Sequence, residues 1–83
     1  MIDDVLKLVV LSAEKQVVDL ACSKVSFPGT KGNFTVLKNH RALISSLGQG
    51  KICYRTEGQE YEIEIKSGFV EVRENEVTAC VEL

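Results

Sequence analysis

The sequence predicts an all-β domain, in which antiparallel strands form a sandwich or a barrel. Apolar and polar residues alternate with a period of two along almost the whole chain, as they do in strands that bury one face. Turn-forming residues interrupt this alternation about every seven to ten residues. No long segment has the period of about 3.6 residues that marks an amphipathic helix. These three observations together argue against a helical fold.

Three strands are expected in the first half of the chain. They cover residues 5–12, 17–25 (continuing through a kink to 27) and 33–37. The first strand is apolar on nearly both sides. Val5, Val9 and Leu11 lie on one face of the strand, and its other apolar residues lie on the opposite face. Such a strand is expected inside a sandwich or beneath a partner.

The second half begins with an ambiguous segment, 42–47, which could form a helical turn and a half. Six residues that end at Gly48 are too few for a stable helix, so a strand is predicted. The strands after it are expected at 51–56, 61–66, 69–73 and 77–83. In strand 61–66 the isoleucines alternate with Glu62 and Glu64, which predicts one solvated face.

A tight loop is predicted at 28–32. Pro28 is the only proline, and it fixes its own φ and favours an extended Phe27. Gly29 can supply the positive φ that a type II turn requires, and Gly32 frees the backbone before the next strand. Two interpretations remain open, a hairpin corner and a loop displayed for contact. A second turn is expected at 38–41, where Asn39 tolerates the left-handed region.

Composition limits the class of protein. A chain of 83 residues fits one domain, 1–83, and buries about 60–65% of its unfolded surface. The net charge is −2 with both signs interspersed, which argues against a nucleic-acid binder. No apolar run approaches the roughly 20 residues that span a bilayer. The acidic N-terminus is unlike a signal peptide, so the chain is expected to stay in the compartment where it is made.

The residues offer little chemistry. Cys22, Cys53 and Cys80 are widely spaced and lack C-x-x-C pairing, which argues against zinc and against a disulfide framework. His40 is the only histidine, and general acid-base catalysis would need a second titratable partner. The 28–32 loop lacks the longer glycine-rich span of a phosphate-binding loop. The residues alone therefore predict no catalytic residue, cofactor or metal, and a small β domain that acts by contact.

Three motifs carry a family resemblance. Residues 26–43 read Ser-Phe-Pro-Gly-Thr-Lys-Gly-Asn-Phe-Thr-Val-Leu-Lys-Asn-His-Arg-Ala-Leu, residues 67–72 read Ser-Gly-Phe-Val-Glu-Val, and residues 6–14 read Leu-Lys-Leu-Val-Val-Leu-Ser-Ala-Glu. In order and spacing the chain resembles the N-terminal domain of the epsilon subunit of the rotary ATP synthase. It departs from the family at Lys31, often acidic in relatives, at Lys38 and Asn39, usually Pro-Gly, and at Arg41, usually small. The C-terminal helical pair that the family usually adds is not in this sequence.

The resemblance implies a flattened antiparallel β-sandwich of about ten short strands and a non-catalytic role. The family's domain joins the gamma subunit of the central stalk to the membrane c-ring, at the cytoplasmic face of the bacterial plasma membrane, and helps couple proton transport to ATP synthesis. Whether the ion is a proton or sodium stays open. The residues matched to the c-ring contact are Gly29, Thr30, Lys31, Gly32, His40 and Arg41, and the candidates for the gamma-facing side are Val5, Val9 and Leu11.

Two other classes of protein are alternatives to this family. A biotinyl or lipoyl carrier domain is also a small β-sandwich, but it needs a lysine in a Met-Lys-Met or Asp-Lys-Ala setting, and no lysine here has those neighbours. A small ligand-binding β module would need an aromatic pocket, which is hard to build with no tryptophan and 6% aromatic residues. Both remain alternatives to the rotor subunit.

Overall fold

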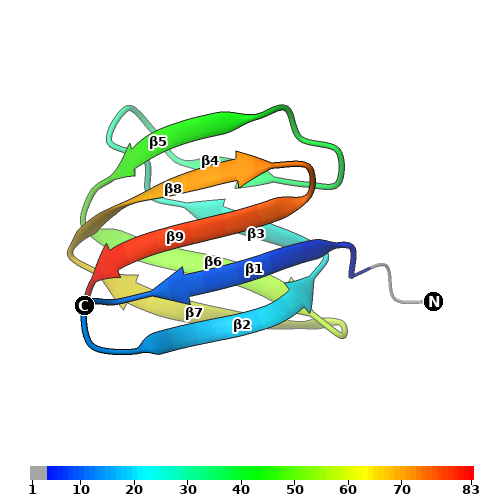
Figure 1. The fold of residues 1–83 in the computed structure, drawn as a ribbon, viewed down its shortest axis with the longest axis horizontal. Helices are drawn as coiled ribbons and strands as arrows, with labels where there is room; N and C mark the ends of the chain where they lie inside the picture. Colours follow the sequence, from blue (N-terminus) through cyan, green and yellow to red (C-terminus); the bar gives the residue numbers. More distant parts are fainter. Residues whose placement is uncertain (1–3) are drawn as a thin grey trace.

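Nine strands form two stacked sheets in residues 4–83, the part of the chain that the computed structural model describes (Figure 1). They are β1 (Leu6–Leu11), β2 (Gln16–Cys22), β3 (Lys24–Phe27), β4 (Phe34–Val36), β5 (Leu43–Leu47), β6 (Gly50–Thr56), β7 (Gln59–Ile65), β8 (Ser67–Arg73) and β9 (Glu76–Glu82). The five-stranded sheet has the order β2-β1-β9-β8-β5, and the four-stranded sheet has the order β4-β3-β6-β7. Three of the four residues in the acidic N-terminus lie outside the described residues.

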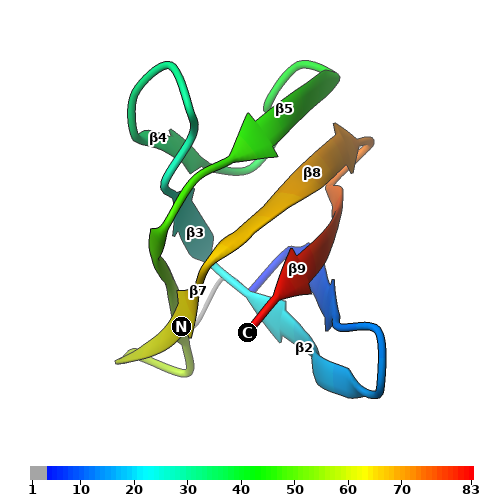
Figure 2. The same cartoon turned by 90° about the vertical axis from the view of Figure 1, so that its left-hand side faces the viewer.

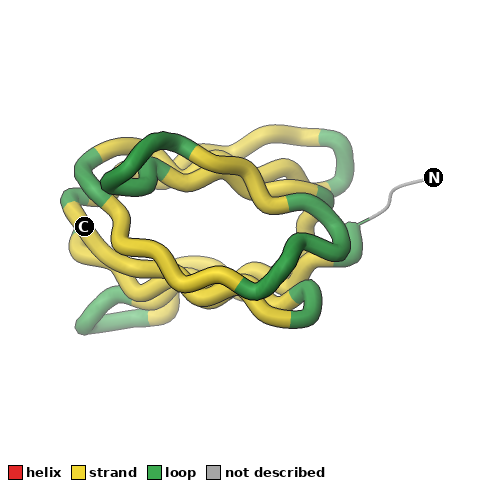
Figure 3. Tube along the Cα trace, turned by 90° about the horizontal axis from the view of Figure 1, so that it is seen from above, coloured by secondary structure: helices red, strands yellow, loops and turns green. Residues whose placement is uncertain are grey.

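The predicted sandwich is confirmed, with extents of 34 × 24 × 17 Å that make it flattened. The two layers are visible from the side in Figure 2, and Figure 3 shows strands along both long sides with connections at the ends. Segment 42–47 forms a strand, as predicted, over Leu43–Leu47. The resemblance implied about ten strands, and the described residues form nine.

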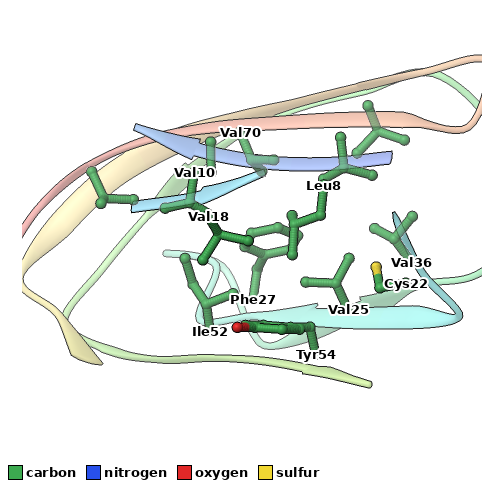
Figure 4. Packing of buried hydrophobic residues seen from close by; sticks show 14 of the residues in the cluster. Leu8, Val10, Val18, Cys22, Val25, Phe27, Val36, Ile52, Tyr54 and Val70 are labelled. Atoms are coloured by element: carbon green, nitrogen blue, oxygen red, sulfur yellow. The ribbon is translucent and has the colours of Figure 1, made fainter. Parts of the chain in front are cut away.

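The core lies between the sheets and consists of aliphatic and phenylalanine side chains, the Cys22 thiol and the ring of Tyr54. In β1 the buried residues are Leu6, Leu8 and Val10, the face that the alternation assigns to the interior. Phe27 is the largest fully buried side chain and meets the ring of Phe34 at a centroid distance of 5.6 Å. Figure 4 shows side chains of both sheets interdigitating. Among residues 4–83 no polar residue is classed as buried, so the fold depends on hydrophobic burial.

The predicted second strand is wrong in one respect, because it consists of two strands in different sheets. β2 ends at Cys22 in the five-stranded sheet, and β3 begins at Lys24 in the four-stranded sheet. The chain bends at Ser23, whose backbone N–H donates to the Arg55 carbonyl at 2.8 Å. The buried positions change from even to odd across this bend, from Cys22 to Val25. The expected kink is therefore a crossing from one layer to the other.

One strand pair departs from the antiparallel order. β1 and β9 run parallel, with Lys7 opposite Glu76 and Leu11 opposite Cys80, while the other paired strands are antiparallel. This pair joins the first and the last strand in the middle of the five-stranded sheet. The first and the last strand of the described residues are therefore direct neighbours in the sheet.

Candidate functional site

The 28–32 loop is anchored to the sandwich at its base. Pro28 is buried, and its carbonyl accepts a hydrogen bond from the Gly48 N–H at 2.8 Å. Gly50 is needed beneath it, because a Cβ there would lie 2.7 Å from the Pro28 Cβ. Hence the β5–β6 connection and the loop fit together only with a glycine at position 50.

The turn inside this loop differs from the predicted one. The Gly32 N–H donates to the Gly29 carbonyl at 3.1 Å, so Thr30 and Lys31 are the central residues. The positive φ falls at Gly32 (131°), not at Gly29, which is a correction to the type II prediction. Glycine at the last position of a turn with two ordinary central residues is typical of type I. Gly29 is required for space, since a Cβ would lie 2.6 Å from the Gly32 carbonyl oxygen.

Ser46 of β5 holds the tip of the loop. The Thr30 N–H donates to the Ser46 carbonyl at 3.1 Å, and the two hydroxyl oxygens lie 2.6 Å apart. Gly29 also forms a bridge with Leu47. Thr30, Lys31 and Gly32 are nevertheless exposed. Residues 28–33 connect the antiparallel pair β3 and β4, so the hairpin corner is confirmed, and its tip is accessible. The display of this loop for contact stays a prediction.

His40 and Arg41 lie in the connection from β4 to β5. The His40 N–H donates to the Leu37 carbonyl at 3.1 Å across Asn39, which has the predicted left-handed φ of 65°. The His40 Nδ1 lies 2.8 Å from the Arg41 carbonyl and donates to it. This local bond is the role expected of a turn histidine.

The structure does not bring all the predicted ring-contact residues together. Thr30 lies beside Ser46 near the end of β5, whereas Arg41 precedes its start at Leu43. Figure 1 shows the two connections at opposite ends of β5. With about 3.3 Å per residue, the length of β5 separates them by roughly 13 Å. They therefore form two separate groups along one edge of the sandwich.

The gamma-facing candidates lie along β1 and the residue before it. Val9 and Leu11 point outward from the five-stranded sheet, on the side opposite the core. Val5 precedes β1 and lines a shallow groove with Lys7 and Asp19, and Asp19 lies opposite Val9. The groove therefore adjoins the outward pair.

Two outward side chains were missed by the sequence prediction. Phe69 is 57% exposed and Ile44 is 74% exposed, and both lie on the same outer side as Leu11. In register, Leu11 lies opposite Cys80 and Cys80 lies opposite Phe69. We call the apolar part of this surface the apolar face; it consists of Val9, Leu11, Ile44, Phe69 and Cys80, and Glu71 and Thr78 lie between Ile44 and Val9 on the same outer side. The alternation in 69–73 could have indicated that Phe69 faces outward, because Val70 and Val72 occupy the inward positions of that strand.

The outer side of the four-stranded sheet has the opposite character. Arg55 pairs with Glu60 at 2.7 Å and Lys51 with Glu62 at 3.3 Å, across β6 and β7. The hydrogen bond that Lys51 donates to Glu62, and the negative charge of Glu62, raise the pKa of Lys51. We call this surface the charged face; it consists of Lys51, Arg55, Glu60, Glu62 and Glu64. The prediction of a solvated glutamate face is thus supported by cross-strand partners.

The described residues offer no cluster for a metal. Within residues 4–83 no group of three or more potential ligands among His, Cys, Asp and Glu is close enough to hold an ion. Cys22, Cys53 and Cys80 are free thiols, and burial raises the pKa of Cys22 to about 11. The same part of the chain contains no helix long and apolar enough to cross a membrane.

Comparison with known proteins identifies related chains. The family model described as "ATP synthase, Delta/Epsilon chain, beta-sandwich domain" matches residues 5–82. The ATP synthase epsilon chain of Pelotomaculum thermopropionicum is 36% identical over 78 residues, which cover 94% of this chain and 58% of that relative. The ATP synthase epsilon chain of Nitratidesulfovibrio vulgaris is 32% identical over 77 residues, which cover 93% of this chain and 58% of the relative. The chain thus spans a little over half the length of these relatives.

Solved structures share the fold. A chain of the Euglena gracilis mitochondrial ATP synthase, solved as OSCP/F1/c-ring, superposes with a TM-score of 0.88 at 18% identity, over 98% of this chain and 52% of that chain. A chain of the Tetrahymena thermophila mitochondrial ATP synthase central stalk and c-ring superposes with a TM-score of 0.80 at 12% identity, over 100% of this chain and 67% of that chain. At these identities the likeness concerns the fold alone.

Proposed function

Because this chain belongs to the ATP synthase delta/epsilon family of β-sandwich domains, we propose that it is a non-catalytic rotor subunit of the central stalk. In this role it fastens the gamma subunit to the membrane c-ring and helps couple proton transport to ATP synthesis. It is peripheral to the membrane, on the cytoplasmic face of the bacterial plasma membrane, through the complex alone. It needs no cofactor.

One feature of the five-stranded sheet carries the proposal. Ser46, which holds the loop tip, lies opposite Phe69; Phe69 lies opposite Cys80, and Cys80 opposite Leu11. A single cross-strand row therefore runs from the proposed ring contact to the proposed gamma contact. With about 4.8 Å between neighbouring strands, the row is roughly 14 Å long. Backbone hydrogen bonds link the four strands of this row, perpendicular to the strands in the antiparallel pairs and slanted in the parallel β1–β9 pair.

This row suits an adaptor that transmits torque. The load at the loop passes through Thr30 and Ser46 into β5 and then across paired strands, with no flexible segment between. The packed core beneath resists bending, because protein interiors are nearly as dense as organic crystals. The apolar face supplies the desolvated contact that a stable partner needs. His40 and Arg41 form a second ring contact at the other end of β5.

Two variants test the proposal by separating its two contacts. Leu11→Asp is expected to weaken co-purification with gamma and to leave binding to the isolated c-ring unchanged. Deletion of 29–32 is expected to do the reverse. Circular dichroism and a thermal melt of each variant establish that the sandwich still folds. Loss of both partners by one folded variant, or of neither by both, contradicts the assignment of separate contacts.

A further inference from the structure

The charges of this chain are less evenly interspersed than its net charge suggests. Between Asp19 and Glu57 the sequence contains no acidic residue. The same segment contains six basic residues, which are Lys24, Lys31, Lys38, Arg41, Lys51 and Arg55. The segment therefore corrects the expectation of interspersed signs, and its position in the fold decides what the charge can do.

Three of these cations lie at one edge of the sandwich. Lys51 and Arg55 are paired on the charged face, whereas Lys31, Lys38 and Arg41 form no ion pair within residues 4–83. All three are exposed. Lys31 lies in the 28–32 loop, and the other two lie in the β4–β5 connection. Figure 2 shows both connections at the top of the sandwich, beside the edge strands β4 and β5. We call these three residues the basic edge.

Both ends of the basic edge are fixed in position. Lys31 is held by the bonds between Thr30 and Ser46 described above. At the other end, the Asn39 N–H donates to the Asn75 Oδ1 at 2.7 Å, which ties the β4–β5 connection to the β8–β9 turn. Two acidic residues lie near this end: Glu74, which precedes Asn75, and Glu71, which lies opposite Ile44 of β5. Fixed backbones reduce the ordering cost of a contact, so these cations are prepared for a partner of matching spacing.

We propose that the basic edge docks on an acidic protein surface, and that the exposed loops of the c-ring beneath this chain are net negative where they meet it. This inference rests on the proposed function, and it assigns the chemistry of that contact. The roughly 13 Å between the two fixed ends favours a protein, whose carboxylates have fixed positions. Lipid headgroups diffuse laterally, and three cations would contribute only about 1 kcal/mol each at an anionic membrane.

A charge-reversal experiment tests this contact. The test variant is Lys31→Glu with Lys38→Glu and Arg41→Glu, and the matched control is Lys7→Glu with Lys15→Glu and Lys66→Glu, which changes the net charge equally. Binding of each full chain to the purified c-ring of the same organism is measured at about 0.05 M and about 0.3 M NaCl. Thermal melts establish that both variants fold.

The expected results are specific. The wild-type chain should bind the ring about tenfold more weakly at the higher salt concentration. At low salt the test variant should bind about tenfold more weakly or worse, and the control within about twofold of wild type. Equal binding by the two variants overturns the inference but leaves the ring contact standing. A wild-type chain that fails to bind the ring at low salt overturns the proposed function and the inference with it.

A third arm separates protein from lipid. Vesicles of phosphatidylcholine with phosphatidylglycerol replace the ring in the same assay. Weak binding, with no difference between the test and control variants, is expected. If the wild-type chain binds these vesicles as tightly as it binds the ring, and the test variant does not, the basic edge binds anionic lipid. That result overturns the inference of an acidic protein surface.

Discussion

The two outer faces of the sandwich follow the same alternation but present different chemistry. On the five-stranded sheet, outward positions carry Leu11, Ile44 and Phe69 together with Glu71 and Thr78, and no ion pair forms there among the described residues. On the four-stranded sheet, outward positions carry carboxylates and cations that pair across β6 and β7. Only the inward residues are needed to form the core. The outward residues are therefore free to match the surroundings of each face, either a partner or solvent. The difference indicates a face for a partner and a face for water.

The largest expected effect concerns the apolar face. The double variant Leu11→Asp/Phe69→Asp should weaken the affinity for gamma roughly a thousandfold, at about 2 kcal/mol for each buried anchor. Isothermal titration calorimetry measures it. The matched control is Thr35→Asp/Cys53→Asp, which places the same charges on the outer side of the four-stranded sheet. If both pairs weaken binding equally, the contrast between the faces fails.

A pH experiment examines the core that separates the two faces. Burial raises the pKa of Cys22 from 9.0 to about 11, so the folded state favours the neutral thiol. The resulting stability is present below pH 9 and is lost as the pH rises toward 11, by about 2–3 kcal/mol. Urea unfolding at several pH values measures this loss. At neutral pH the free energy of unfolding of Cys22→Ala should be about 1 kcal/mol lower than that of the wild type. Between pH 9 and 11 the variant should lose less of this free energy than the wild type does, because it has no thiol to ionise at this position. An identical loss in both proteins assigns the effect to other groups.

The smallest expected effect concerns the charged face. The Arg55–Glu60 pair is about half exposed, so its coupling free energy should be only about 0.2–1 kcal/mol. A double-mutant cycle with Arg55→Ala and Glu60→Ala, followed by thermal unfolding, gives this value. Salt at about 1 M should remove most of it, because exposed charges are screened. A coupling free energy larger than this range and unchanged by salt would mean that the charged face is desolvated. The two faces would then not differ in their exposure to water.

Local patterns predicted much of this fold. The alternation identified the inward residues of β1, the glycine and proline spacing located the 28–32 loop, and Asn39 was assigned its left-handed turn. Each of these depends on neighbouring residues, so one sequence is sufficient. The resemblance then supplied the family, which the match over residues 5–82 confirms.

Features set by distant contacts could not be predicted in the same way. Alternation says which side of a strand is buried but not which sheet the strand joins, so the crossing at Ser23 was missed. The change of buried phase between Cys22 and Val25 was the available signal. The separation of Lys31 from Arg41 follows from the pairing of the loop with Ser46, and that pairing joins residues far apart in the chain. The roles of these residues at the c-ring and gamma remain predictions.

The parallel pairing of β1 with β9 has a consequence for synthesis on the ribosome. Lys7 meets Glu76 and Leu11 meets Cys80, so one side of β1 has no backbone partner until the last strand has left the exit tunnel. The nascent chain can form the β1–β2 hairpin early, but the five-stranded sheet is completed only after translation of residues 76–80. During that interval one edge of β1 exposes unpaired backbone groups beside apolar side chains, and other nascent chains can pair with it. Molecular chaperones would act at this stage.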